Sequence, residues 1–172
     1  GLSTGVAEFL YTDGLAPELT GAWQFSGGLY AFLNWWDALQ PTATGRTVIA
    51  EKFNARSTKG FSYTTAALEP LRIEGALVAM GLMPDYVAGA ADKRWVSPAQ
   101  QYIAGGDSLK DKRIRQRKFL KAVDMDVTGR LLGAPNSDDA RSAICHGLAY
   151  LARSGHKATF DLIRSGNDRI NH

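Results

Sequence analysis

The segment Thr47–Phe53, TVIAEKF, decides the fold class. Its short apolar run, Val48–Ala50, ends at the carboxylate of Glu51, a pattern typical of a buried central strand whose carboxyl end carries functional groups. Apolar residues recur at helical spacing on both sides of this strand, over Leu29–Trp36 and over Tyr63–Met83. The sequence therefore predicts an α/β fold in which helices flank a central sheet.

The other predicted elements do not divide the chain. We find no repeat, no low-complexity tract and no linker, so residues 1–172 are interpreted as a single domain, with a polar tail after Gly155 that is expected to fray. The remaining predicted elements are strands at Val6–Tyr11 and Leu19–Phe25 joined by an Asp13-Gly14 turn, a stop at Pro41, a possible kink at Pro70, a short strand at Trp95-Val96, a basic helix after Gly105-Gly106 and a helix over Ala140–Ala152.

Length and composition favour a soluble globular protein. The 172 residues are 45% hydrophobic and 22% charged, and no apolar run approaches the roughly 18 to 20 residues needed to cross a bilayer. The single cysteine, Cys145, excludes an internal disulfide and a cysteine-rich zinc site. We therefore expect a cytoplasmic protein without a membrane partner.

Positive charge is concentrated in one segment, Lys110–Lys121, which reads KDKRIRQRKFLK. Seven basic residues and one acid give it +6, which leaves the other 160 residues at −3, although the whole chain carries only +3. Such a segment neutralises phosphates and releases their counterions, which favours DNA or RNA binding. The alternative is a solvated helix face with a few apolar anchors. The candidate phosphate contacts are Lys110, Lys112, Arg113, Arg115, Arg117 and Lys118.

Three acids are candidate metal ligands. Glu51 ends the predicted central strand, and Asp138 and Asp139 begin a predicted helix. Carboxylate oxygens suit Mg²⁺, and nucleases with two metal ions need several carboxylates around ions roughly 4 Å apart. The alternative for the two aspartates is capping of the helix, and for Glu51 an ordinary surface position at a strand end.

His146 lies two turns beyond these aspartates on about the same helix face, where it would orient a phosphate or transfer a proton near neutral pH. A packed core histidine is the alternative. Its neighbour Cys145 is expected to be a small buried residue. One cysteine and three histidines give no zinc signature, and no Ser/His/Asp arrangement is identifiable.

Five short motifs, in order along the chain, resemble one nuclease family. They are GLSTGVAEF at the start, VIAEKF with Glu51 and Phe53, LRIEGALVAMG, WVSPAQQYIAGGDSLKDKR, and NSDDARSAICH. In this order, and from Gly1 to about Leu151, they resemble the RuvC-type Holliday junction resolvases of the RNase H-like superfamily, particularly divergent members encoded by bacteriophages. The resemblance implies an RNase H-like fold with a mixed central sheet of about five strands flanked by helices.

The resemblance also implies the metal site and the N-terminal boundary. Glu51 and Asp138 or Asp139 would hold Mg²⁺ or Mn²⁺, with His146 beside them, so that a metal-bound water cuts the phosphodiester. Matching AICH selects Asp138, whereas matching Asp-Ala selects Asp139 with Asn136 three residues earlier. The match begins just after the first catalytic aspartate of the family, so the first strand is expected to be missing before Gly1 and residues 1–172 alone to be catalytically crippled.

The expected activity is a crossover-junction endodeoxyribonuclease of DNA recombination and repair. A homodimer would present two related active sites to the two equivalent phosphates of a four-way junction, in a bacterial cell or a phage-infected host. Phe53 or nearby Phe61 would wedge into unstacked bases, with core packing as the alternative for Phe53. The four tryptophans are expected in the core or the dimer interface. Alternative functions are another RNase H-like nuclease that cuts hybrids or flaps, and a non-catalytic DNA-binding protein with the same fold.

Overall fold

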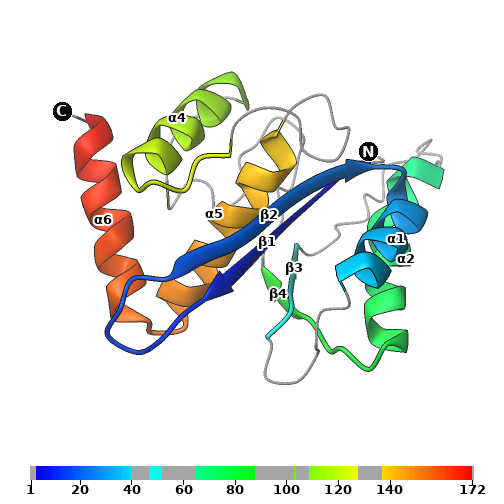
Figure 1. Cartoon of the computed structure of the whole chain (residues 1–172). Helices are drawn as coiled ribbons and strands as arrows, with labels where there is room; N and C mark the ends of the chain where they lie inside the picture. Colours follow the sequence, from blue (N-terminus) through cyan, green and yellow to red (C-terminus); the bar gives the residue numbers. More distant parts are fainter. Residues whose placement is uncertain are drawn as a thin grey trace, which may run out of the picture.

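The computed structural model describes residues 3–39, 47–51, 65–87, 103, 109–127 and 137–171. A long antiparallel hairpin spans the molecule in Figure 1, with helices α4, α5 and α6 toward one end and helices α1 and α2 at the other. A second, short pair of strands, β3 and β4, lies between them. The described chain is therefore a mixed α/β structure, as the sequence predicts.

The hairpin consists of β1 (Ser3–Leu10) and β2 (Glu18–Ser26), paired so that Val6 faces Trp23. The predicted Asp13-Gly14 turn connects them, and Gly14 adopts the left-handed φ of 83° that glycine accepts without strain. A bulge between Glu8 and Phe9 interrupts the register. Both predicted strands and their turn are confirmed.

Helix α5 (Asp138–Arg153) packs against β1 of the hairpin. Two glycines allow this close approach. A Cβ atom at Gly5 would collide with the backbone of Asp139, and one at Gly147 would lie 2.6 Å from the ring of Phe9. The start of α5 is therefore fixed directly beside the first strand.

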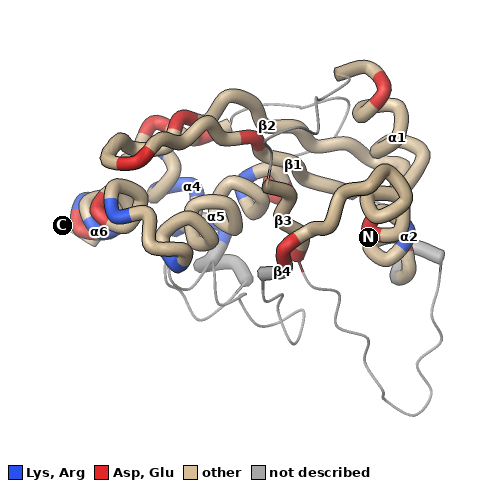
Figure 2. Tube along the Cα trace, turned by 90° about the horizontal axis from the view of Figure 1, so that it is seen from below, with Lys and Arg blue, Asp and Glu red and all other residues tan. Residues whose placement is uncertain are grey.

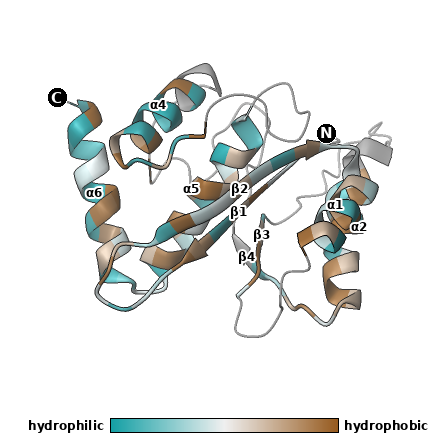
Figure 3. Cartoon of the chain, in the orientation of Figure 1, coloured by the Kyte–Doolittle hydropathy of each residue, from teal (hydrophilic) through white to brown (hydrophobic). Residues whose placement is uncertain are grey.

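The larger core lies between α5, α4 (Leu109–Ala122) and α6 (Lys157–Asn171). Phe119 and Leu120 of α4 are fully buried, and Ile163 of α6 is almost so. The expectation of a frayed tail after Gly155 is wrong, because α6 has an apolar side that packs on this core; Figure 3 shows hydrophobic and hydrophilic positions alternating along α6. Cys145 is buried, as predicted.

The second core joins β2 to α1 (Gly28–Leu39) and α2 (Thr65–Ala79), around Phe25, Phe32 and Leu77. Three tryptophans pack around these residues as an aromatic cluster, which agrees with the expected core role, and the fourth, Trp95, lies outside the described residues. The cluster tryptophans are Trp23, Trp35 and Trp36. Helix α2 is shorter than predicted and contains Pro70 in its second turn.

The segment predicted as a buried central strand forms β3 (Ile49–Glu51), which is only partly buried and pairs in parallel with β4 (Asp85–Val87) in a two-stranded sheet of the described residues. Strand β4, which begins directly after Pro84, is not among the predicted strands. Among the described residues there are two separate two-stranded sheets, so a five-stranded sheet is not observed there. The predicted strand at Trp95-Val96 lies outside the described residues. No helix in the described part of the chain is long and apolar enough to cross a membrane.

Candidate functional site

The first turn of α5 carries the two predicted aspartates, and a residue from β2 caps it. Gln24 Oε1 accepts hydrogen bonds from the backbone N–H groups of Asp139 and Ala140, at 2.9 and 3.1 Å, while the side chain of Ser137 at the N-cap position accepts no capping hydrogen bond from the described residues. The buried Gln24 thus caps two N–H groups of the first turn.

Asp138 is held by two arginines from different helices. Its Oδ2 lies 3.0 Å from Nε of Arg113 on α4, and its Oδ1 lies 3.6 Å from Nη1 of Arg141 on α5. The structure thus brings a predicted metal ligand, Asp138, against a predicted phosphate contact, Arg113. The acidic helix start and the basic helix are neighbours in space.

Arg141 extends this contact into a buried charge network that the sequence analysis did not find. Its Nε lies 2.7 Å from Oδ1 of Asp126, and its Nη2 donates to the carbonyl oxygen of Val127. Oδ2 of Asp126 lies 3.7 Å from Nε of Arg117, a second predicted phosphate contact. The side chains of Arg141 and Asp126 are only 9% and 6% exposed, so this central pair of the network is shielded from solvent.

The remaining basic side chains of α4 differ in their surroundings. Arg115 donates to Oδ1 of Asn171 at 3.1 Å, while Lys118 is exposed. Lys110 and Lys112 belong to α4, but their side chains lie outside the described residues. Figure 2 shows Lys and Arg along α4 and acidic residues along the hairpin. Residues 1–45, which include the hairpin, contain no Lys or Arg.

Glu51 and His146, both predicted as site residues, are brought together. Oε2 of Glu51 at the end of β3 lies 3.5 Å from Nε2 of His146 on α5. The Glu51 side chain is 50% exposed, whereas that of His146 is 9% exposed, and both ring nitrogens of His146 are buried without a hydrogen-bond partner among the described residues. An imidazole in this state is poised to bind or orient a polar group that approaches Glu51.

One turn further along α5, a second contact fixes the short sheet, and it was not predicted. The hydroxyl of Tyr150 donates to Oδ2 of Asp85 at the start of β4, at 2.5 Å. This hydrogen bond raises the pKa of the Tyr150 hydroxyl above its ordinary value, and burial acts in the same direction. His146 and Tyr150 therefore each make one contact between α5 and the β3–β4 pair.

The predicted metal ligands lie at two separate positions along α5. Glu51 lies beside His146, which is seven residues and about 10 Å of helix rise from Asp139. Within the described residues, no three His, Cys, Asp or Glu side chains gather as a metal site would require. These residues supply the carboxylate oxygens that Mg²⁺ prefers, but they do not by themselves form a complete ligand set.

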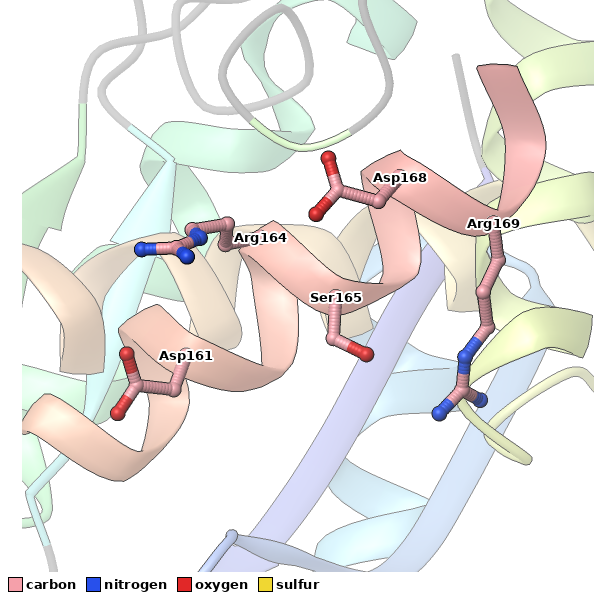
Figure 4. Close-up of a pocket in the computed structure, with 5 residues that line it drawn as sticks. All are labelled: Asp161, Arg164, Ser165, Asp168 and Arg169. Carbon is pink, nitrogen blue, oxygen red and sulfur yellow. The ribbon is translucent and has the colours of Figure 1, made fainter. Parts of the chain in front are cut away.

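The remaining sequence candidates, Phe53, Phe61 and Asn136, lie outside the described residues. A shallow hollow of about 370 Å³ lies on the surface of α6 and contains none of the predicted site residues (Figure 4). It is lined by Asp161, Arg164, Ser165, Asp168 and Arg169.

Comparisons of the chain with protein-family models, with curated proteins and with solved structures found no match.

Proposed function

We propose that the protein is a metal-dependent, structure-selective endodeoxyribonuclease that resolves four-way and related branched DNA by paired nicks. One observation carries the proposal, namely the contact between Arg113 of the basic helix α4 and Asp138 at the acidic start of α5, at 3.0 Å. A nuclease needs cations that bind the phosphate backbone beside acids that support its cleavage. The two groups come from segments 25 residues apart in sequence and are neighbours in the fold.

Helix α4 is the proposed DNA-binding element. Its arginines and lysines would bind backbone phosphates and release counterions, which gives affinity without sequence preference. Arg113 and Arg117 lie four residues apart, so their side chains project from one face of the helix. The proposed phosphate contacts are Lys110, Lys112, Arg113, Arg115, Arg117 and Lys118.

The proposed catalytic residues are Glu51, His146 and one or both aspartates at the start of α5. Glu51 with Asp138 or Asp139 would hold Mg²⁺ or Mn²⁺, which supplies an activated water and stabilises developing charge when it is bound. His146 would orient the carboxylate of Glu51, since Nε2 lies 3.5 Å from it. Its imidazole would also contact a phosphate oxygen near Glu51 and exchange a proton with it.

The proposal extends to the sheet and to the assembly. An RNase H-like fold would unite the β1–β2 and β3–β4 pairs in one mixed sheet of about five strands, with α5 along it. A symmetric homodimer would match the two equivalent phosphates of a four-way junction, and so yield paired nicks. We place the reaction in DNA recombination and repair, in the cytoplasm of a bacterial or phage-infected cell.

Substrate competition tests the nuclease class. We expect the full-length protein with Mg²⁺ to nick a mobile four-way junction at symmetric positions, and to leave an RNA/DNA hybrid and a flap uncut. Preferred cutting of the hybrid or the flap, without symmetric nicks in the junction, would assign it to a different nuclease of this fold.

A non-catalytic DNA-binding protein is the second candidate. It is favoured by one observation, the double contact of Asp138 with Arg113 and Arg141, because a carboxylate neutralised by two arginines is typical of a structural ion pair. This candidate predicts junction binding of equal strength with and without Mg²⁺ and no strand cleavage in either condition.

A further inference from the structure

We propose that Arg117 is a pre-aimed phosphate ligand and that Asp126 and Arg141 are the positioning residues that aim it. The inference rests on the proposed function, because it deepens the role of α4 in DNA binding. It assigns to a buried acid, Asp126, a favourable effect on the binding of an anion.

Asp126 is fixed before it meets Arg117. Its Oδ1 lies 2.7 Å from Nε of Arg141, and Arg141 also binds the carbonyl oxygen of Val127, the next residue in the chain. With side chains 6% and 9% exposed, the two charges are held out of solvent, where an ion pair has little freedom to rearrange. Asp126 therefore presents its second oxygen, Oδ2, in one direction.

The second oxygen, Oδ2, lies near Arg117 but beyond hydrogen-bond distance of its Nε. Oδ2 of Asp126 accepts no hydrogen bond within the described residues, and Nε of Arg117 lies 3.7 Å away, which is ion-pair rather than hydrogen-bond distance. The Arg117 side chain is 54% exposed. Arg117 is thus attracted toward one orientation, and its N–H groups donate to no residue that the structure describes, so they can make the planar, two-point contact of guanidinium with phosphate.

Arg113 provides the contrast on the same helix face. Its Nε lies 3.0 Å from Asp138, which is hydrogen-bond distance, so its carboxylate partner engages the guanidinium directly. A phosphate must compete with Asp138 for Arg113, whereas at Arg117 it joins an ion pair at 3.7 Å that, within the described part of the chain, occupies none of the guanidinium donors at hydrogen-bond distance. Of these two arginines, Arg117 is the one prepared for an incoming phosphate.

The proposal and simple charge counting predict opposite signs for one substitution. Asp126→Asn removes a negative charge near the basic helix, which by Coulomb attraction alone would strengthen DNA binding. If Asp126 aims Arg117, the same substitution releases the Arg117 side chain and weakens binding. The loss of one phosphate contact reduces the magnitude of the negative slope of log K against log[salt] by about 0.9. The ratio of the affinities at 50 and 200 mM salt therefore becomes about 3.5-fold smaller.

The experiment measures the affinity of the full-length protein for a synthetic four-way DNA junction in EDTA, at several salt concentrations. We expect Asp126→Asn to weaken binding and to lower the salt slope by about 0.9. The matched control is Asp124→Asn, which removes the same charge from an exposed position two residues away and leaves affinity and slope at or slightly above the wild-type values. Thermal unfolding of each variant verifies that it is folded.

Two further variants separate aiming from a general structural role. In the double variant Asp126→Asn with Arg117→Ala, the salt slope should equal that of Arg117→Ala alone, because both substitutions remove the same phosphate contact, that of Arg117. Arg141→Lys keeps the charge but cannot bridge the same groups, so it should weaken binding in the same direction, and it replaces Asp126→Asn if that variant does not fold. Unchanged or tighter binding by Asp126→Asn, or additive slopes in the double variant, overturns the inference. Absence of junction binding by the wild type instead overturns the proposed function.

Discussion

Gln24 determines how the acidic end of α5 is presented. It is 1% exposed, its Oε1 accepts from two backbone N–H groups of α5, and its Nε2 donates to the hydroxyl of Ser3 on β1. A single side chain thereby joins both hairpin strands to the helix start. No local pattern in the sequence indicates this contact, because Gln24 and Asp139 are 115 residues apart.

Gln24→Ala should lower the free energy of unfolding by about 1–3 kcal/mol, because it leaves buried N–H groups of α5 without an acceptor. Urea unfolding followed by circular dichroism measures this change. Thr20→Ala, at an exposed position on the same strand, is the control and should change the value by no more than about 0.5 kcal/mol. Equal effects of the two substitutions would mean that Gln24 does not cap α5.

Glu69 plays a similar role at the start of α1. Its Oε2 accepts from the N–H of Leu29 at 2.7 Å, and its Oε1 pairs with Arg72 at the same distance. The hydrogen bond from Arg72, and then that from Leu29, lower the pKa of Glu69 below its ordinary value of 4.5. Since the charged form is favoured in the folded state, its contribution to stability is present above the unfolded pKa and is lost as the pH falls through the folded pKa.

Glu69→Gln should therefore destabilise the protein at neutral pH, and the difference from wild type should shrink as the pH is lowered below 4.5. Thermal unfolding of both proteins across the acid range tests this. A difference that stays constant from neutral to acid pH would contradict the ion-pair and capping role of Glu69.

The elements differ in how well the sequence predicts them. The hairpin, α1, α2, β3 and α5 follow from periodicity and turn residues close together in the chain. The β4 strand was missed because three residues carry no periodicity, and it is defined by its pairing with β3. The α6 helix was missed because its polar residues hide a narrow apolar side, and it is stabilised by packing on α4 and α5.

The packing of α6 can be tested at Ile163, which is 3% exposed in the larger core. Ile163→Ala should lower the free energy of unfolding by about 2–5 kcal/mol, as expected for a large-to-small change in a core. The control is the adjacent exposed residue, Arg164→Ala, with an effect of about 0.5 kcal/mol or less. A negligible effect of Ile163→Ala in urea unfolding would mean that α6 is not packed on the core and that the segment after Gly155 is frayed.

The candidate site was also predicted unevenly. Glu51, His146 and Asp138 follow from strand-end and helix-start patterns, and the structure places the first two side by side. Asp126, Arg141, Asp85 and Tyr150 could not be selected, because each acquires its role from a partner in another element. Ion pairs of this kind depend on tertiary packing and have no signature in local sequence.

At the scale of the whole molecule, charge is separated along the fold. Residues 1–45 contain acids but no Lys or Arg, whereas α4 concentrates basic residues beside the start of α5 (Figure 2). The hairpin contributes residues to both hydrophobic cores. The basic helix α4 packs on α5, and the β3–β4 pair contacts α5 through Glu51 and Asp85. Such a distribution would orient a nucleic-acid backbone toward one side of the protein.

The most direct test of the proposed nuclease activity is cleavage of a mobile four-way junction by the full-length protein in Mg²⁺, compared with Glu51→Gln. The account predicts symmetric nicks by the wild type and by the exposed control Glu18→Gln, and at least a 100-fold slower reaction by Glu51→Gln, roughly the loss expected for a key electrostatic group. Junction binding in EDTA should survive in all three proteins. Cleavage by Glu51→Gln at the wild-type rate, or no Mg²⁺-dependent cleavage by the wild type, would contradict the proposed function.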